Sequence, residues 1–217
     1  TVLGELGYDV LLVGRTLPGS LPLERPYRTK RMRLLFRKGP LFYAEYNLRL
    51  FWKLLSISPN WVYAVDADTL LASSTFKKIK GGKLIFDAHE FFEESPEIIG
   101  ENLIQKTWSH IIKWGTSNAD LCLTVAPILA EVLSQKYKVK FHSIRNLPIK
   151  KNFPESFTNR QKVLWYQGVL NIGRGLEQTI QALRLLPEYQ LWIAGDGDIS
   201  DQLHELVLKL NLSERVK

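Results

Sequence analysis

Residues 163–198 read VLWYQGVLNIGRGLEQTIQALRLLPEYQLWIAGDGD, and this stretch decides the fold. A short apolar run leads into a glycine-rich loop, Gly168 to Gly175, and an amphipathic run then leads into a second apolar run that ends in Gly195-Asp196-Gly197-Asp198. The pattern predicts a strand, a loop, a helix, a strand and a turn. A loop that opens a helix presents free backbone N–H groups and the positive end of the helix dipole. Because Arg174 stands at that opening with no acid directly beside it, the stretch predicts a site for a phosphate-bearing ligand.

Two better-known phosphate loops have a similar glycine spacing, and single residues exclude them. A nucleoside-triphosphate P-loop needs Lys and then Ser or Thr where this chain has Arg174 and Gly175, so the hydroxyl that would bind magnesium is absent. The dinucleotide fingerprint G-x-G-x-x-G does not fit the loop either. An NTPase and a dinucleotide-dependent enzyme are therefore disfavoured.

The stretch resembles the start of the donor-binding domain in family 4 of the retaining glycosyltransferases. In that family a strand ends in Gly, an Arg-Gly or Lys-Gly pair follows, and the strand after the next helix ends in Gly-x-Gly. The resemblance implies that Arg174 grips the donor's diphosphate, although Val169 stands where the family often has a second Arg. It also implies a nucleotide-diphosphate sugar as donor substrate, with no separate cofactor and no metal. The donor site would be lined by Gly168, Gly173, Gly175, Gly195 and Gly197.

The turn at Gly195-Asp196-Gly197 has a second interpretation that is equally good. It is simply a tight turn, with Asp198 capping the helix that follows.

Composition describes an ordinary globular protein. Of 217 residues, 45% are hydrophobic and 24% are charged, which is enough for one large or two modest domains. A single cysteine, Cys122, lies in an apolar run, where it reads as a small core residue. One cysteine excludes an internal disulfide and favours a reducing compartment, so we expect a cytoplasmic protein. No apolar run approaches the roughly 18 residues of a membrane span.

The net charge of +7 is concentrated in one segment. Between Arg25 and Lys53, nine basic residues stand against one acid, Glu45, with aromatic residues interleaved. One interpretation is a solvated basic loop followed by a helix whose aromatic residues face the core. A second is contact with an anionic membrane surface, which would place the protein at the inner face of the membrane. Nucleic acid is a third, for which no binding motif appears. The cations of the membrane interpretation are Arg28, Lys30, Arg31, Arg33 and Arg37.

Strand-like and helix-like runs alternate along the whole chain. The predicted strands are 9–13, 61–65, 83–87, 121–125 and 141–144, and the predicted helices are 41–55, 68–80, 102–118, 127–136 and 201–210. Such alternation predicts an α/β fold with parallel sheets that are covered by helices on both faces. The pattern stops at residues 146–161, which contain two prolines and no periodicity, and it restarts at Lys162.

We therefore predict two Rossmann-like domains. Residues 1–145 form an N-terminal, acceptor-side domain, residues 146–161 a linker, and residues 162–217 the start of a C-terminal, donor-binding domain. The layout resembles the GT-B fold, in which ligands bind between two such domains.

Both ends of the chain predict a fragment of a longer enzyme. Residues 3–8 read as the end of a helix with a glycine stop, so the strand at 9–13 would be the second of its domain and the first, central strand would be missing. The predicted strand at 9–13 is too apolar for a natural edge. At the other end, Val216 and Lys217 read as the start of another strand, so the C-terminal domain is predicted to be truncated.

A second motif, Asp87-Ala88-His89-Glu90, follows a buried strand. Ligands bind at the carboxyl edge of open α/β sheets, and a His there can donate to a sugar or phosphate oxygen or act as a base. Asp-x-His-Glu recurs at this place in the acceptor domain of family 4 enzymes, and the resemblance favours His89 as a catalytic residue. Glu90, Glu93 and Glu94 read as a solvated turn, with Glu90 the best exception. The second His of a zinc-protease helix is absent.

Asp66-Ala67-Asp68-Thr69 follows the predicted strand at 61–65. A helix begins at once, and we expect Asp68 or Thr69 to cap it. Asp66 is at the strand end and is a candidate for the catalytic cleft, because acidic residues recur after this strand in family 4.

The leading hypothesis is a retaining glycosyltransferase that moves a sugar from a nucleotide-diphosphate donor to a hydroxyl of a glycan or lipid-linked acceptor. His89, Glu90 and Asp66 are its catalytic candidates. The glutamates that hold the donor in this family lie further along than residue 217, so this chain is expected to be inactive alone. The alternatives are a sugar-nucleotide epimerase of the same fold and a non-enzymatic nucleic-acid-binding module. The basic segment argues against the epimerase, which needs no acceptor.

Overall fold

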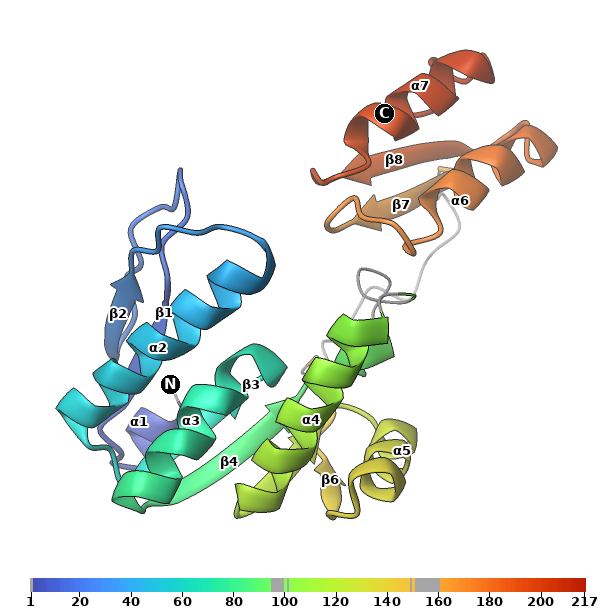
Figure 1. Ribbon diagram of the computed structural model, residues 1–217. Helices are drawn as coiled ribbons and strands as arrows, with labels where there is room; N and C mark the ends of the chain where they lie inside the picture. Colours follow the sequence, from blue (N-terminus) through green and yellow to red (C-terminus); the bar gives the residue numbers. More distant parts are fainter. Residues whose placement is uncertain (1, 95–99, 101, 149, 151–160) are drawn as a thin grey trace. The chain divides into compact units, whose positions relative to one another are not determined.

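A computed structural model describes residues 2–94, 100, 102–148, 150 and 161–217 (Figure 1). Contacts between residues divide the chain into two compact units, Thr1–Leu147 and Pro148–Lys217. Most of the predicted linker, 146–161, lies outside the described residues.

The first unit is an α/β structure in which all strand pairs are parallel, as predicted. Its helices are α1 (Val2–Glu5), α2 (Gly39–Ile57), α3 (Ala67–Lys80), α4 (Asn102–Asn118) and α5 (Pro127–Tyr137), with one 3-10 turn, η1 (Phe92–Glu94). Its strands are β1 (Leu11–Arg15), β2 (Arg28–Met32), β3 (Trp61–Val65), β4 (Lys83–Ala88), β5 (Leu121–Thr124) and β6 (Phe141–Ser143).

The strands of this unit form two sheets instead of one, with orders β1-β2 and β3-β4-β5-β6. Within the described residues, β1 is paired only with β2 and β3 only with β4, so each has a strand partner on one side alone. The predicted free edge of the first strand is therefore present, although β1 is shifted by two residues from the predicted 9–13. Strand β2 was missed by the sequence analysis, because Arg-Thr-Lys-Arg-Met contains no apolar run.

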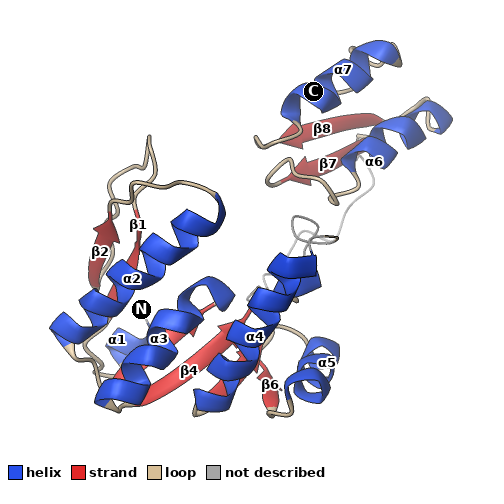
Figure 2. Cartoon of the chain, in the orientation of Figure 1, coloured by secondary structure: helices blue, strands red, loops and turns tan. Residues whose placement is uncertain are grey.

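The helices α2 to α5 form one layer, in which each helix contacts the next (Figures 1 and 2). The short helix α1 lies on the opposite side of the strands (Figure 1), so among the described residues helices are on both sides of the first unit but on one face only of the four-stranded sheet. Parallel crossovers are right-handed, and the steps from β3 to β6 all run in the same direction along the sheet, so their helices lie on one face. On the other face, the side chains of Trp61, Tyr63 and Val65 are 56%, 49% and 39% exposed.

The core of the first unit lies between this helix layer and the strands. Buried Val62 and Ala64 of β3 and Leu84 and Phe86 of β4 point into it, and Val13 of β1 packs against the same cluster. Both sheets therefore share one hydrophobic core although they share no ladder hydrogen bonds.

Two close contacts fix the helices against one another. The buried amide of Asn47 in α2 donates to the carbonyls of Tyr43 and Asp68, at 2.9 and 2.8 Å, and accepts from the Ala72 amide at 3.0 Å. A methyl group at Gly115 of α4 would lie 2.3 Å from Cγ of Leu70, so the absence of a side chain there lets α3 and α4 approach.

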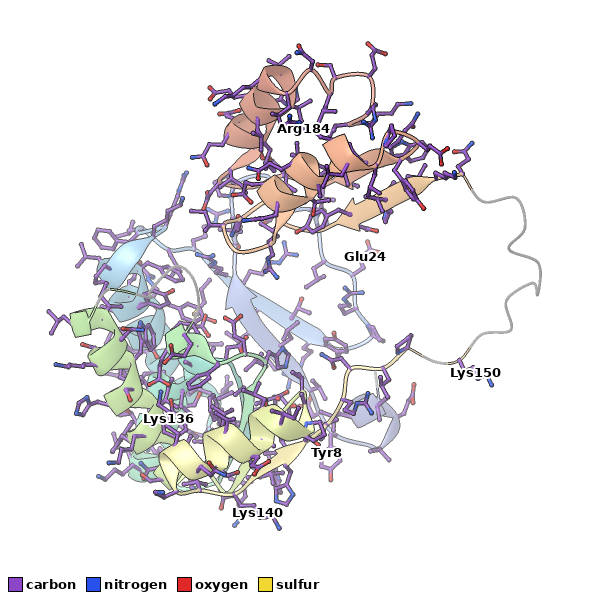
Figure 3. All side chains as sticks on the ribbon, turned by 90° about the vertical axis from the view of Figure 1, so that its right-hand side faces the viewer. Tyr8, Glu24, Lys136, Lys140, Lys150 and Arg184 are labelled. Atoms are coloured by element: carbon purple, nitrogen blue, oxygen red, sulfur yellow. The ribbon has the colours of Figure 1, made fainter. Side chains whose placement is uncertain are left out.

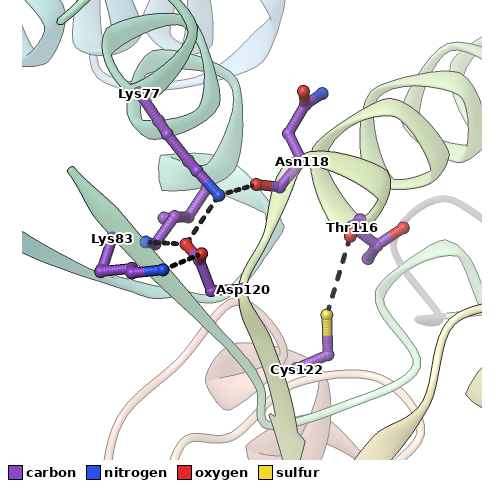
Figure 4. A network of polar contacts seen from close by, with 7 residues as sticks. Lys77, Lys83, Thr116, Asn118, Asp120 and Cys122 are labelled. Carbon is purple, nitrogen blue, oxygen red and sulfur yellow. Dashed lines mark hydrogen bonds and ion pairs between the residues drawn. The ribbon is translucent and has the colours of Figure 1, made fainter. Parts of the chain in front are cut away.

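An ionic network joins three elements at the amino edge of the four-stranded sheet (Figure 4). Asp120, directly before β5, accepts hydrogen bonds from Nζ of Lys77 at 2.6 Å, from Nζ of Lys83 at 3.1 Å and from the Leu84 amide at 2.8 Å. Lys77 also donates to the Asn118 carbonyl at the end of α4. These contacts lower the pKa of Asp120 against the opposing effect of burial.

The second unit repeats the parallel pattern with β7 (Val163–Gln167), α6 (Leu176–Ala182), the 3-10 turn η2 (Leu183–Leu185), β8 (Gln190–Ala194) and α7 (Ser200–Lys209). Its core includes Leu176, Ile180 and Leu191. Val216 pairs with Leu191 in a parallel bridge, which confirms that strand structure resumes at the predicted place. Trp165 and Trp192 are register partners on the sheet face away from this core.

Candidate functional site

The carboxyl edge of β3 and β4 brings three polar side chains together. The phenol of Tyr63 donates to Oδ2 of Asp87 at 2.6 Å, and Nε2 of His89 lies 3.0 Å from the same oxygen. Asp87 and His89 are two residues apart at the end of one strand, so their side chains share a face. Partial burial, the hydrogen bond to Asp87 and the charge of Asp87 raise the pKa of Tyr63, so the phenol remains a donor at neutral pH. The carboxylate therefore orients the imidazole.

Asp66 reaches the same histidine through the backbone. Its Oδ1 accepts from the amide of His89 at 3.0 Å, and its own amide donates to the Asp87 carbonyl at 2.9 Å. Asp66 has φ 57° and ψ 170°, a conformation that glycine adopts and other residues avoid, at a cost of about 1–3 kcal/mol. The two hydrogen bonds hold this strained residue in place. Asp66 thus positions the loop that carries His89.

Helix α3 is not capped as predicted. Its N-cap residue is Asp66, whose carboxylate faces the His89 amide and makes no cap hydrogen bond, while Asp68 is inside the helix. The hydroxyl of Thr69 donates to the Val65 and Asp66 carbonyls instead of accepting from the helix amides. Burial, and then the charge of Asp66, raise the pKa of Asp68 to about 6.

The two glutamates after His89 have different environments. Glu90 is exposed, as predicted, and lines a small cavity of about 10 Å³ together with Asp66 and Tyr137. The interpretation of Glu93 as part of a solvated turn was wrong, because its side chain is buried at 2% exposure. It accepts from the Tyr137 hydroxyl and lies 3.2 Å from Nζ of Lys136 on α5 (Figure 3), while Oε1 has no hydrogen-bond partner in the described part of the chain. Glu93 therefore ties the loop after His89 to α5.

In the second unit, the glycine loop runs from the end of β7 to the start of α6. Gly173 and Gly175 have φ of 86° and 73°, and Gly175 is the N-cap residue of α6. Arg174 is exposed between them and makes no hydrogen bond or ion pair with any described residue. The loop thus presents an unpaired guanidinium beside the first amides of a helix, as the sequence predicted.

The glycine loop and the turn after β8 are packed directly on each other. A methyl group at Gly195 would lie 1.8 Å from the Gly168 carbonyl oxygen, and one at Gly197 would lie 2.4 Å from that of Leu170. The amides of Gly168 and Leu170 donate to the carbonyls of Ala194 and Asp196. Gly195 and Gly197 are thus required for backbone packing, which is an interpretation the sequence analysis did not contain.

The cap predicted for the last helix is absent. Helix α7 begins at Ser200 and its N-cap residue is Ile199, so Asp198 is not at the predicted N-cap position. The hollow lined by Lys162, Gln190 and Lys217 lies around the first residues of β7 and β8, at the opposite end of the strands from the glycine loop.

The structure therefore groups His89, Glu90 and Asp66 at one edge of the first unit, and Gly168, Arg174, Gly195 and Gly197 at one edge of the second. Asp87 and Tyr63 were missed as members of the first group. Within the described residues, no cluster of three His, Cys, Asp or Glu side chains is suited to hold a metal ion.

Of the comparisons with known proteins, that with solved structures identifies the fold. No protein-family model matches the chain, and no curated protein matches it. Among solved structures, a sucrose-phosphate synthase from Thermosynechococcus elongatus is similar at TM-score 0.74 and 16% identity, over 99% of this chain and 61% of that one. HepE from Anabaena, in complex with UDP and glucose, is similar at TM-score 0.62 and 17% identity, over 88% of this chain and 55% of that one.

A third structure, the apo form of the lipopolysaccharide outer core galactosyltransferase WaaB, is similar at TM-score 0.53 and 17% identity, over 88% of this chain and 52% of that one. The chain thus spans about half to three fifths of the length of the structures it resembles. At such low identities the likeness concerns architecture. The chain has the GT-B fold, with parallel α/β units that match the Rossmann-like domains of these glycosyltransferases.

Proposed function

We propose that this protein is part of a retaining glycosyltransferase of family 4 that transfers a sugar from a nucleotide-diphosphate donor to a hydroxyl of a glycan or lipid-linked acceptor. The observation that carries the proposal is the glycine loop of a GT-B fold, with Arg174 unpaired among the described residues at the opening of α6. Neighbours in structure, such as HepE, are solved with UDP and glucose. A leaving nucleoside diphosphate gains charge during transfer, and a fixed guanidinium with helix amides stabilises such charge.

The first unit would supply the groups that act at the sugar. His89 contacts a sugar or acceptor hydroxyl through its imidazole, and Asp87 holds the ring in place by accepting from Nε2. Asp66 is a positioning residue, because its carboxylate contacts the His89 backbone and not the ring. Glu90, which is exposed beside the same cavity, is placed for a contact with the acceptor.

Two substitutions separate binding from chemistry. Arg174→Ala should weaken the affinity for a nucleoside diphosphate by about tenfold or more, because a charge-assisted hydrogen bond contributes roughly 1.5–3 kcal/mol. His89→Ala should lower turnover and leave that affinity nearly unchanged. Arg184→Ala, an exposed arginine at the far end of the α6–η2 helix (Figure 3), and His110→Ala on α4 are the matched controls.

Calorimetry with UDP, ADP and GDP and product analysis with the corresponding sugar donors provide the readout, on the intact enzyme. Unchanged affinity in the Arg174 variant would remove the diphosphate role. Formation of an epimerised sugar nucleotide without an acceptor would replace the transferase proposal by the epimerase.

We also infer that the chain is a part of a longer enzyme. Support comes from the one-sided pairing of β1 and β3 and from the exposed apolar face of β3. A parallel strand between β1 and β3, followed by a helix on that face, would join the two sheets.

A further inference from the structure

Helix α2 has an apolar stripe on the side that faces solvent. Leu41, Leu48 and Trp52 are spaced by seven and four residues, which places them on one side of a helix. They are 59%, 59% and 62% exposed. The buried residues of α2, among them Phe42, Tyr46, Leu50 and Leu54, lie on the opposite side. The stripe is therefore at the centre of the exposed side, and packing within the described residues does not account for it.

The loop before α2 adds a further apolar side chain to this side. Glu45, the single acid of the basic segment, accepts from the amides of Leu35 and Phe36, at 2.8 and 3.0 Å, and from Nε of Arg49 at 2.7 Å. These hydrogen bonds lower the pKa of Glu45, with Phe36 making the largest contribution. Glu45, the one acid between Arg25 and Lys53, thus holds the backbone of Leu35 against the helix, and the Leu35 side chain is 79% exposed.

Cations surround the stripe, but not all basic residues of the segment belong to it. Arg28 pairs with Asp9, and Arg31 donates to the Leu21 carbonyl. Lys30 and Arg28 are on β2, where charged side chains protect a sheet edge from further pairing. Arg33 and Arg37 are exposed in the loop that carries Leu35, each two residues from it.

We propose that the exposed side of α2, with the preceding loop, docks on an anionic lipid bilayer. Leu35, Leu41, Leu48 and Trp52 enter the interfacial region, and Arg33 and Arg37 contact lipid headgroups. Charge complementarity selects this occupant, since the loop contributes the exposed Arg33 and Arg37 and the one acid of the segment, Glu45, is already bound to Arg49. No described helix is long and apolar enough to cross a membrane, so the contact is peripheral. The proposal does not rest on the proposed function.

The aliphatic side chains distinguish a bilayer from a nucleic acid. Cations with aromatic residues would suit either partner, because bases stack on aromatic rings. Three of the four apolar residues are leucines, which cannot stack and which gain free energy only when they leave water. A membrane interface accepts both leucine and tryptophan.

The first test is sedimentation of the intact protein with vesicles of phosphatidylcholine alone or mixed with phosphatidylglycerol. Wild type should bind only the anionic vesicles. Leu48→Gln with Trp52→Gln should lower the partition coefficient by about tenfold or more at low and high salt, because the loss is apolar. Arg33→Gln with Arg37→Gln should weaken binding mainly at low salt. The control for the apolar pair is Leu103→Gln with Ile128→Gln, which are 79% and 78% exposed on α4 and α5. The control for the arginine pair is Lys106→Gln with Lys113→Gln on α4.

A fluorescent probe tests the depth of the contact. The one native thiol, Cys122, is buried and its pKa is raised to about 12 by burial, so it resists labelling in the folded protein. A nitrobenzoxadiazole dye at Trp52→Cys should brighten and shift to the blue with anionic vesicles, whereas the same dye at Ile128→Cys should not.

Several results would overturn the proposal. Wild-type vesicle binding that is absent, or that is unchanged by the Leu48 and Trp52 substitutions, would remove it. Tighter binding to a single-stranded oligonucleotide than to anionic vesicles would favour nucleic acid. A dimer that those two substitutions dissociate would assign the surface to a second copy of the chain.

Discussion

At the scale of single residues, the catalytic candidates of the first unit depend on one another. His89 and Asp66 were predicted from their position after strands, and the structure places them within one hydrogen bond. Asp87 was missed as the partner of the imidazole, although its place two residues before His89 indicated a shared face. Tyr63 could not be predicted, because its reach depends on the register that pairs Val65 with Asp87. Sequence order gives the strand ends, and register decides which side chains meet there.

Asp66→Gly should keep the folding stability of the protein and remove the contact that positions the His89 loop. Glycine adopts φ 57° without strain, which gains about 1–3 kcal/mol and offsets the roughly 0.5–1.5 kcal/mol of the lost hydrogen bond to the His89 amide. The variant should be at least as stable as wild type in urea and slower in sugar transfer. Asp66→Asn keeps the accepting oxygen and is the control. Full turnover in the glycine variant would show that the His89 loop needs no anchor.

Asp68 should make the free energy of unfolding fall as the pH rises. Its pKa of about 6 is above the ordinary value of an aspartate, so the folded state binds a proton that the unfolded state releases. Its contribution to stability is therefore fully present below about pH 4 and is lost as the pH rises to about 6. Asp68→Asn should be more stable than wild type at pH 7.5, by on the order of 2 kcal/mol, and similar at pH 4. If chemical denaturation gave the Asp68→Asn variant and wild type the same free energy of unfolding at pH 7.5 as well as at pH 4, this prediction would be contradicted.

At the scale of elements, periodicity predicted most of the helices and strands, and β3 and α4 have the predicted bounds. Two kinds of information were absent from the pattern. Strand β2 forms from a basic sequence because it pairs in parallel with β1, and the local strand propensity of residues 28–32 does not reveal that pairing. Glu93 is buried because Lys136 and Tyr137 arrive from α5, far along the chain.

Gly115→Ala should force α3 and α4 apart. The new methyl group would lie 2.3 Å from Cγ of the fully buried Leu70, and overpacking of this kind costs about 1–3 kcal/mol. The cost should shrink in a Leu70→Ala background, where the space is empty, so a double-mutant cycle in urea should reveal coupling. Gly14→Ala on β1, with no atom near the added methyl, is the control. Additive losses would refute the contact.

Asp120→Asn should weaken the junction of α3, β4 and β5. Because contacts with Lys77, the Leu84 amide and Lys83 lower the pKa of Asp120, its contribution is present above the ordinary aspartate pKa and is lost as the pH falls through the folded value. The variant should lose about 1–3 kcal/mol at pH 7, and the difference from wild type should narrow in strong acid. Cys122→Ala, the buried thiol next to the network in Figure 4, serves as a nearby control without a charge. A loss that is independent of pH would point to packing instead.

At the scale of the whole molecule, two α/β units of a GT-B fold and the one-sided pairing of β1 agree with the sequence analysis. Alternation of apolar runs is sufficient for these features, because each depends on the number and order of strands. The open face of the four-stranded sheet was not predicted. The open face results from the order of the strands, since each of β4, β5 and β6 is added on the same side of the one before it. Hydrophobic periodicity gives the strands but not their order in the sheet.

The one-sided pairing of β1 and β3 gives a test of the proposed missing strand. In the longer protein proposed above, amides on the facing edges of β1 and β3 should exchange hydrogen more slowly than in the 217-residue chain, while those between β4 and β5 should change less. Hydrogen-exchange mass spectrometry compares the two proteins under one set of conditions. Equal exchange at β1 and β3 would mean that no strand enters between them.

The ionic network around Asp120 has a consequence for how such a protein can diverge. It lies where β5 begins, whereas His89 follows the end of β4, so the charges that secure the sheet and the groups proposed to act on a sugar occupy opposite edges. A substitution among the loops around His89 leaves the Asp120 contacts untouched. For the proposed transferase, substitutions in those loops can therefore change the acceptor while the Asp120 network is retained.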